Sequence, residues 1–319
     1  MTGPQPSQAP TRVLVIANPT AGSATSALLA GVRDQCGAFA PTTLHITTAR
    51  GEATESVQRA LAEVHPPDLV VVIGGDGTVR EVVEGLVGTS TANLMIIPGG
   101  TGNSAYRMLW ADKSWSDALA SVFAGTAEPR RLDLARIEET RALVFLGACS
   151  GVVAEALVHA KQTVLTGRAR YAQALSDAAA AFEPYPGQVI VDGKVLFEGR
   201  TILANVGGGR YRGGQYLLLP LSELGDGLLD VVVVSAQVPV QRVPDLVRNG
   251  DHLGEPGVFY GRGSRIEVLR TDGQALVFEH DGELQQDVAN GMSLQVLSGA
   301  LRVWCDPAVV PPSTQRELW

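Results

Sequence analysis

Cysteine is scarce in this chain of 319 residues. Its three cysteines, Cys36, Cys149 and Cys305, lie far apart and form no C-x-x-C pair. An odd number of isolated cysteines provides neither a disulfide framework nor a zinc site, and it is typical of a reducing compartment. We therefore expect a cytoplasmic protein.

Long apolar runs and an excess of positive charge are missing as well. No stretch approaches the roughly 20 apolar residues that a membrane-spanning helix needs. The 33 acidic residues outnumber the 25 basic ones, which gives a net charge of −8. This balance argues against a nucleic-acid partner and against a strong polybasic membrane anchor, so any contact with a membrane is expected to be transient and peripheral.

The beginning of the chain lacks the features of a targeting segment. Residues 1–10 are rich in Pro, Gln and Ser, without the basic start and apolar centre of a signal peptide, and we expect a disordered tail. The remaining sequence is typical of a globular protein, since 45% of the chain is hydrophobic and 18% is charged. Its length favours two domains of ordinary size.

The most informative motif is the pentapeptide Gly74-Gly75-Asp76-Gly77-Thr78. It follows an apolar run and precedes a helix-like segment, which predicts a strand that turns on glycines into a helix. Backbone N–H groups and the positive end of a helix dipole then meet at one point, and that point attracts phosphate. Glycines let a triphosphate approach the backbone, and Asp76 is able either to bind Mg²⁺ or to accept a hydrogen bond as a helix cap.

Two other apolar segments end in loops of the same kind. The carboxyl ends of parallel strands meet at one edge of a sheet, where ligands bind at the switch in strand order. We therefore expect three loops to converge on one nucleotide site. The first loop contains Asn18, Pro19, Thr20, Ala21 and Gly22, and the third is Pro98-Gly99-Gly100-Thr101-Gly102-Asn103.

Strands and helices alternate from residue 11 to residue 136. Such alternation predicts an α/β domain, in which helices cover both faces of a parallel sheet. We expect strands at 12–17, 42–47, 69–73 and 93–97, helices near 25–36, 52–64 and 78–87, and helical segments to about 124.

The pattern changes after residue 136. Helical stretches at about 152–164 and 169–182 are followed by many short strands that Gly-containing turns separate. Asp192-Gly193 and Asp272-Gly273 each lie between short apolar segments and predict β-hairpins. We expect residues 137–304 to form a mostly antiparallel β-sandwich domain.

In order and spacing, these motifs resemble the diacylglycerol kinase catalytic-domain superfamily over roughly residues 12–304, and within it the soluble bacterial lipid kinases similar to diacylglycerol kinase B. The motif at 74–78 is shared with NAD kinases, whereas Asp281-Gly282-Glu283 together with the other loops favours the lipid-kinase branch. The resemblance implies an ATP-binding domain followed by a lipid-substrate domain. It also implies that the last segment, about 305–319, packs back on the ATP-binding domain.

Three carboxylates are candidates for catalysis. Phosphoryl transfer needs a held γ-phosphate, a Mg²⁺ ion that bridges the phosphates and an aligned acceptor hydroxyl. Asp76 is the candidate metal-linked carboxylate. The resemblance implies that Glu283 is the base that takes the acceptor's proton and that Asp133 completes the carboxylate and water network around Mg²⁺. From the residues alone, Glu283 fits an ordinary hairpin turn with a solvated side chain better than a catalytic base, and the resemblance reverses this preference. For Asp133, a boundary position in a strand is the alternative.

The resemblance implies a second, structural Mg²⁺ in the segment 221–230. Its ligands would be the side chain of Asp226 and the backbone carbonyls of Glu223 and Leu228, oxygen donors that suit a hard cation. An ordinary Asp-Gly turn before a strand explains the same residues. The resemblance further implies that Thr47 and Thr101 contact the nucleotide.

Some positions depart from the family pattern or leave alternatives open. Ala21 stands where the family often has Ser, which would remove one phosphate contact. His280 is compatible with an imidazole that titrates near the base, but we favour a surface imidazole on a turn. The arginines of Arg210-Tyr211-Arg212, flanked by glycines, are compatible with a mobile loop that meets a lipid head group or with scattered solvated side chains.

These features lead to one functional hypothesis and two alternatives. We expect a kinase that uses ATP and Mg²⁺ and transfers the γ-phosphate to a lipid hydroxyl, with diacylglycerol, a related glycerolipid or a sphingoid as acceptor. The alternatives are a kinase of the NAD kinase type with a soluble substrate, and a non-catalytic protein that binds nucleotide or lipid. A homodimer is compatible with the sequence.

Overall fold

The structure, a computed structural model, describes residues 9–89, 91–285 and 289–310. The chain divides into two compact units, one formed by Met1–Leu132 with Gly299–Trp319 and one formed by Asp133–Ser298. Most of the predicted tail at 1–10 lies outside the described residues. In the part of the chain that the structure describes, no helix has the length and apolar character needed to cross a membrane.

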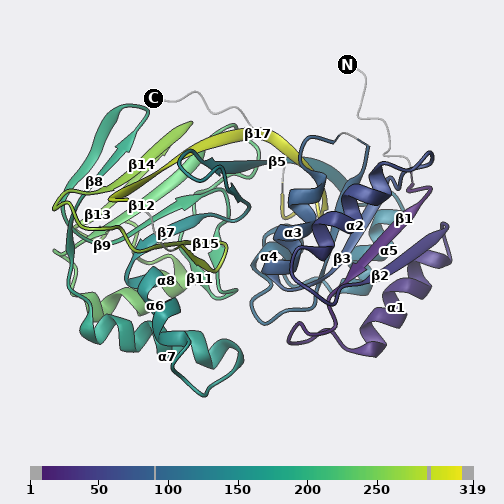
Figure 1. Ribbon diagram of the computed structural model, residues 1–319, viewed down its shortest axis with the longest axis horizontal. Helices are drawn as coiled ribbons and strands as arrows, with labels where there is room; N and C mark the ends of the chain where they lie inside the picture. Colours follow the sequence, from purple (N-terminus) through teal and green to yellow (C-terminus); the bar gives the residue numbers. More distant parts are fainter. Residues whose placement is uncertain (1–8, 90, 286–288, 311–319) are drawn as a thin grey trace. The chain divides into compact units, whose positions relative to one another are not determined.

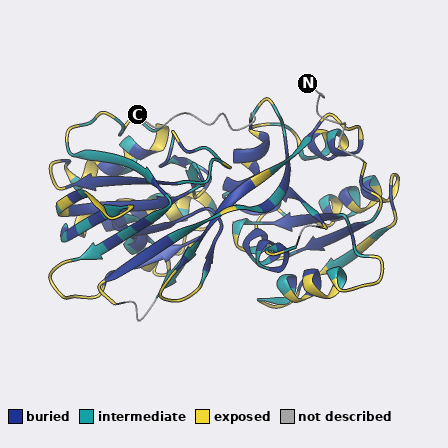
Figure 2. Cartoon of the chain, turned by 90° about the horizontal axis from the view of Figure 1, so that it is seen from above, coloured by how far each residue is buried: buried dark blue, intermediate teal, exposed yellow. Residues whose placement is uncertain are grey.

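The first unit contains a parallel sheet with the strand order β4–β3–β1–β2 (Figure 1). All residues of β3 are buried, as expected of a strand that helices cover on both sides. Figure 2 shows these buried strands between helices whose outer sides are exposed. The strands are β1 Val13–Ala17, β2 Thr42–Ile46, β3 Leu69–Gly74 and β4 Asn93–Pro98, and the helices are α1 Ser26–Gly37, α2 Glu52–Leu61, α3 Asp76–Leu86, α4 Ser104–Trp110 and α5 Trp115–Phe123.

The strand order places a switch point beside β1. This strand pairs with β2 on one side and with β3 on the other. The chain therefore runs from β1 to β2 toward one edge of the sheet and from β3 to β4 toward the opposite edge. The helix starts follow from local sequence. Thr25 caps α1 by accepting the Leu28 N–H at 3.2 Å, and α3 begins at Asp76, two residues after β3 ends at Gly74.

The second unit is mostly antiparallel, which confirms the predicted fold class. The long strand β9 is central, because it pairs with β8, β7 and β12. The shorter strands are β6 Leu143–Val144, β7 Ala148–Gly151, β8 Tyr185–Val191, β10 Tyr211–Arg212, β11 Tyr216–Leu217, β12 Leu229–Ser235, β13 Val258–Gly263, β14 Arg265–Arg270, β15 Phe278–His280 and β16 Glu283–Gln285. The long strand is β9 Lys194–Gly207, and the helices are α6 Val152–Ala160, α7 Gly167–Ala181, η1 Val240–Arg242 and α8 Val243–Asn249.

Two strands contribute to both units. β5 (Glu128–Ile137) begins in the first unit and ends in the second, and β17 (Gly291–Cys305) runs from the second unit into the first. The chain then continues along the first unit, where the Asp306 N–H donates to the Leu109 carbonyl at 3.1 Å and its carboxylate pairs with Lys113 at 2.6 Å. Residues beyond 310 in the predicted returning segment lie outside the described residues.

One predicted hairpin is confirmed and the other is wrong. Asp192 and Gly193 have φ of 46° and 77°, the left-handed pair that a tight hairpin turn requires, and they join β8 to β9. By contrast, β14 pairs with β8 and β17, and no strand begins directly after Asp272-Gly273. Asp272 is instead bound by the Arg270 guanidinium at 2.8 Å and 3.0 Å, so that this turn is closed by side chains rather than by strand pairing.

Candidate active site

The three predicted nucleotide loops meet in the first unit. Asn18 Nδ2 donates to Thr78 Oγ1 at 3.0 Å, which joins the first loop to the second. The Ser23 N–H donates to the Gly99 carbonyl at 2.8 Å, and the Gly99 N–H donates to the Gly74 carbonyl at 2.9 Å. The hydrogen bonds therefore connect all three loops at the carboxyl ends of β1, β3 and β4.

Glycine is required here by loop packing. A Cβ atom added to Gly100 would lie 2.3 Å from the Cα of Gly75, and one added to Gly74 would lie 2.6 Å from the Cβ of Thr78. The neighbouring atoms belong to backbone or to a short branched side chain, and they have little room to move. The glycines thus allow the loops to stack on one another, in addition to any approach of a ligand.

We expect Gly100→Ala to weaken nucleotide binding at least about tenfold, because separating the second and third loops disturbs every backbone donor between them. Gly37→Ala, where an added Cβ atom would meet no atom within 4 Å and which lies outside the three loops, is the matched control. Fluorescence titration with an ATP analogue measures the effect, and equal affinities for the two variants would contradict the packing argument.

Asp76 binds the start of a neighbouring helix. Its carboxylate oxygens accept the N–H groups of Ser104 and Ala105, each at 3.1 Å. The capping role considered from the sequence is therefore present, but it serves α4 rather than α3, the helix that Asp76 begins. These bonds hold the carboxylate beside the α3 N-terminus, where its oxygen atoms suit Mg²⁺.

The other predicted nucleotide residues surround the same loops. Thr47 is buried, and its N–H and hydroxyl both donate to the Ala17 carbonyl at 2.8 Å and 3.3 Å. Asn103 has a left-handed backbone with φ of 54°, and its amide bonds both the N–H and the carbonyl of Gly100 at 2.8 Å. Contact with nucleotide stays a prediction for all of the residues proposed for it, namely Asn18, Pro19, Thr20, Ala21, Gly22, Thr47, Gly74, Gly75, Asp76, Gly77, Thr78, Thr101 and Asn103.

In the second unit, Glu283 begins β16 and is half-buried. It pairs with His280 across a tight hairpin whose turn residues, Asp281 and Gly282, have φ of 50° and 83°. The predicted hairpin is present, but Glu283 lies in its second strand. A strand fixes the direction of a side chain better than a solvated turn does, as a positioned base requires.

Asp281 holds that hairpin in place. The buried carboxylate accepts the N–H groups of Phe145, Leu146 and Gly147 at 2.8 Å, 2.7 Å and 3.3 Å. Burial alone would raise the pKa of Asp281. The neighbouring His280 imidazole, the Arg212 charge and the Phe145 N–H together outweigh burial, so that the pKa lies below its ordinary value. These neighbours therefore stabilise the ionised form of the carboxylate.

The residues around Asp281 form a buried charged network. Glu279 accepts the Gly282 N–H at 2.8 Å, and its other oxygen lies 3.6 Å from the Arg212 guanidinium. Burial raises the pKa of Glu279 against the opposing charge of Arg212. His280 is only 3% exposed, so the prediction of a surface imidazole is wrong, and the buried Arg212 does not support the loop of exposed arginines.

Asp133 is joined to the predicted structural metal segment. Its Oδ2 accepts the Gly227 N–H at 2.6 Å, and its own N–H donates to the Leu224 carbonyl at 2.9 Å. The structure thus brings together Asp133 and the segment that contains Glu223, Asp226 and Leu228. A role of Asp133 in a Mg²⁺ network stays a prediction.

Asp226 forms an ion pair with an arginine side chain. Its Oδ2 pairs with the Arg262 guanidinium, its Oδ1 accepts the Leu228 N–H at 3.0 Å, and Arg262 also lies 3.3 Å from Asp230. No group of three or more acidic, His or Cys side chains suited to a metal is found among the described residues. With both carboxylate oxygens engaged, the donor set does not fit a resident Mg²⁺ unless Arg262 moves.

We expect Mg²⁺ without nucleotide to leave the melting temperature of the native protein nearly unchanged, because Arg262 already neutralises Asp226. In Arg262→Ala, millimolar Mg²⁺ should raise it by several degrees, since two carboxylates are then left without their cation. Calorimetric scans with EDTA or Mg²⁺ measure this, with Arg200→Ala as the control. A larger rise in the native protein would support the predicted metal site instead.

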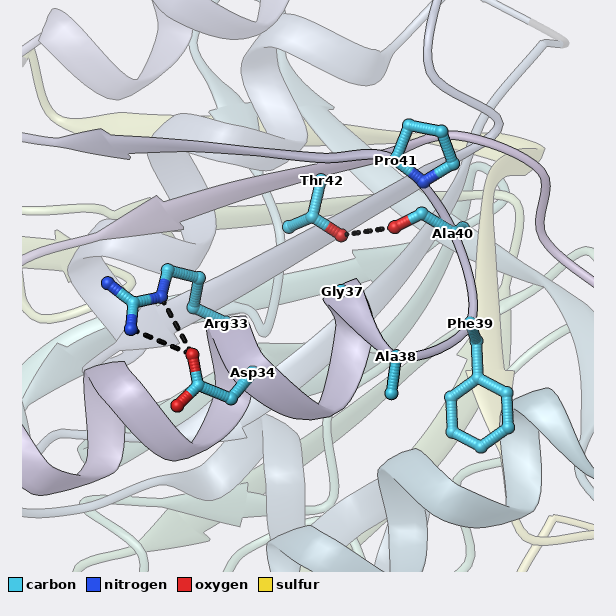
Figure 3. A pocket seen from close by; sticks show the side chains of 8 residues that line it. All are labelled: Arg33, Asp34, Gly37, Ala38, Phe39, Ala40, Pro41 and Thr42. Carbon is cyan, nitrogen blue, oxygen red and sulfur yellow. Dashed lines mark hydrogen bonds and ion pairs between the residues drawn. The ribbon is translucent and has the colours of Figure 1, made fainter.

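A pocket of about 760 Å³ lies elsewhere on the first unit (Figure 3). It is lined by the end of α1 and the start of β2, including Phe39 and Thr42. Parallel strands bind ligands at their carboxyl ends, whereas this pocket lies at the opposite end of β2. No predicted site residue lines it, and we do not assign it to the reaction.

Comparison with known proteins covers both units. Residues 12–137 match the family model of the diacylglycerol kinase catalytic domain, and residues 147–305 match that of the YegS C-terminal NAD kinase beta sandwich-like domain. A probable YegS-like lipid kinase of Pseudomonas aeruginosa is 30% identical over 71% of this chain and 69% of its own length. The chain belongs to the diacylglycerol kinase catalytic-domain superfamily.

Other members of this superfamily resemble the chain at similar levels. A diacylglycerol kinase of Bacillus subtilis is 28% identical over 71% of the chain and 75% of its own length. A solved structure of a candidate diacylglycerol kinase from Bacillus anthracis has a TM-score of 0.76 at 26% identity, covering 95% of this chain and 100% of that one. Yeast NADH kinase, with a TM-score of 0.52 and 11% identity over 94% and 84% of the two chains, shares the fold alone.

Proposed function

We propose that this protein transfers the γ-phosphate of ATP to the hydroxyl of a lipid, with diacylglycerol as the first candidate and phosphatidic acid as its product. The observation that carries the proposal is Glu283 on a hairpin that buried hydrogen bonds hold, in a chain of the diacylglycerol kinase superfamily. Related glycerolipids and sphingoids have the same acceptor group and belong to the same proposal.

The nucleotide half of the proposal is supported by the three joined loops. Backbone N–H groups near the start of α3 suit the phosphates, and the oxygens of Asp76 suit Mg²⁺. When bound, Mg²⁺ would neutralise the charge that develops on the phosphates. Asp76 would help to hold the ion, and Asp133 is the second candidate.

The acceptor half is supported by Glu283. Its carboxylate would take the proton of the acceptor hydroxyl, the acceptor oxygen would form the new bond to the γ-phosphorus, and the bond from that phosphorus to the β–γ bridging oxygen would break. ADP leaves with the bridging oxygen. Asp281 and Glu279 act on this step only through the position of the hairpin.

The proposed localisation is cytoplasmic with transient membrane contact, because a kinase that acts on bilayer lipids from the side of ATP must reach the lipid surface. A soluble acceptor of the NAD kinase type and a non-catalytic binding role are the outcomes against which the proposal is tested.

The experiment is transfer of ³²P from γ-labelled ATP with Mg²⁺ to separate acceptors in mixed micelles. The acceptors are diacylglycerol, monoacylglycerol and sphingosine, with NAD in parallel reactions. Asp76→Asn should lower the transfer at least about tenfold by weakening both metal and loop contacts, and the exposed Asp112→Asn should not. Label on NAD alone, or ATP binding without transfer to any acceptor, would overturn the proposal.

A further inference from the structure

The second unit exposes apolar side chains at the end of its helical hairpin. The helices α6 and α7 pack on each other, and Arg170 Nε donates to the Ala160 carbonyl at 2.7 Å, which fixes their joined ends side by side. In the connection between them, Val164 is 97% exposed and Leu165 is 42% exposed. Figure 1 shows this connection at the outer end of the helix pair, away from the strands of the unit.

Two more apolar side chains adjoin the connection. Val158 near the end of α6 is 38% exposed, and Tyr171 in the first half of α7 is 40% exposed. Of the nine large apolar side chains that are exposed in the described part of the chain, four therefore lie within residues 158–171. Single exposed apolar residues are normal, but such a concentration marks an interaction surface.

The same segment is basic, whereas the protein as a whole is acidic. No Asp or Glu occurs from residue 156 to residue 176, although the whole chain carries a net charge of −8. Lys161, Arg168 and Arg170 all lie within this stretch, and Lys161 and Arg168 are exposed. Basic side chains beside exposed apolar ones suit the interface of an anionic bilayer, where the apolar groups enter the lipid and the cations meet the head groups.

The helix pair also leads to the proposed acceptor site. α6 starts directly after β7, which pairs with β15, and α6 contacts β16, the strand that begins with Glu283. The nine residues of α6 span about 13 Å. The exposed connection at residues 161–166, called the tip below, and the acceptor carboxylate therefore belong to one compact part of this unit.

We propose that Val158, Val164, Leu165 and Tyr171, with Lys161 and Arg168, form the surface by which this protein docks on a bilayer that contains anionic lipids. The reason for docking, access to a lipid acceptor, rests on the proposed function, but the vesicle-binding test does not depend on kinase activity. A second copy of the chain fits this surface less well, because four exposed side chains fall far short of the roughly 800 Å² per partner of a standard protein interface and the basic residues would face each other.

The test is co-sedimentation with vesicles of phosphatidylcholine alone or with about 30 mol% phosphatidylglycerol. We expect binding only to the anionic vesicles, and at least about tenfold weaker binding for Val164→Asp with Leu165→Asp, because each apolar side chain that leaves water contributes on the order of that factor. Val64→Asp is the matched control, since Val64 is 90% exposed in the first unit. Melting temperatures report whether each variant folds.

The possible outcomes test the docking surface and the kinase reaction independently of each other. Unchanged vesicle binding by the double variant, or equal binding to both kinds of vesicle, would overturn the surface and leave the kinase proposal standing. Binding that depends on the tip in a protein without lipid kinase activity supports the surface and removes the proposed reaction. A native dimer that the double variant dissociates in sedimentation velocity, without a change in vesicle binding, would assign the tip to self-association and overturn the proposal.

Discussion

Replacing Glu283 by glutamine is expected to lower the rate of phosphoryl transfer roughly 10²–10⁴-fold, the usual contribution of a positioned general base. Glutamine keeps the size and the hydrogen-bonding capacity of the side chain but cannot accept the acceptor's proton at neutral pH. The hairpin should remain, because its turn is held by Asp281 and Gly282 rather than by Glu283. The turnover number measured with saturating ATP and lipid reports the effect.

Nucleotide binding separates this effect from damage to the fold. The loops that we assign to the nucleotide belong to the first unit, so Glu283→Gln should bind an ATP analogue with native affinity. Glu183→Gln, an exposed carboxylate in the second unit, is the matched control and should be fully active. Native turnover by Glu283→Gln would remove Glu283 from the reaction.

Asp281→Ala is expected to destabilise the second unit by roughly 3–5 kcal/mol, the cost of removing one side of a buried charged hydrogen-bond network. Three backbone N–H groups lose their acceptor, and Arg212 and His280 lose a nearby anion. Chemical unfolding followed by circular dichroism measures the change. Activity should fall as well, because the strand that carries Glu283 is no longer fixed.

The chain contains a matched control for this substitution. Asp192 also begins an Asp-Gly hairpin turn and accepts two backbone N–H groups, from Ser264 at 3.2 Å and Arg265 at 2.9 Å, but it lies in an exposed turn. Asp192→Ala should therefore cost only about 1 kcal/mol. Equal losses for the two variants would show that the burial of Asp281 does not matter.

The pH dependence of the Asp281 effect has a defined sign. A carboxyl whose folded-state pKa is lowered stabilises the fold above its unfolded pKa, and this contribution is lost as the pH falls through the folded pKa. The difference in unfolding free energy between the native protein and Asp281→Ala should be constant near neutral pH. It should shrink below about pH 4, near the ordinary pKa of an Asp.

The sequence predicted the local features well, because the spacing of apolar residues and the residue types of turns depend only on neighbouring positions in the chain. The four parallel strands, the turn at Asp192-Gly193 and the loop that follows each strand were all readable from neighbouring residues. Asp272-Gly273 was misread, since Gly273 is left-handed with φ of 78° but Asp272 is not, so the pair does not form the two-residue type I′ turn that the dipeptide suggested.

The network around Asp281 could not be predicted from the sequence, because its partners lie more than 130 residues away. An Asp-Gly dipeptide looks the same whether its carboxylate is solvated or buried. Arg212 and Arg262 gave no local signal for the same reason: each arginine is partnered by a carboxylate from a distant strand or loop.

One reaction tests the central proposal most directly. Diacylglycerol in mixed micelles and NAD are placed together at equal concentration with γ-labelled ATP and Mg²⁺, and the label in each product is counted over the first minutes. We predict that the label enters phosphatidic acid and that Glu283→Gln abolishes this product. Label that enters the phosphorylated dinucleotide instead would contradict the assignment of a lipid acceptor.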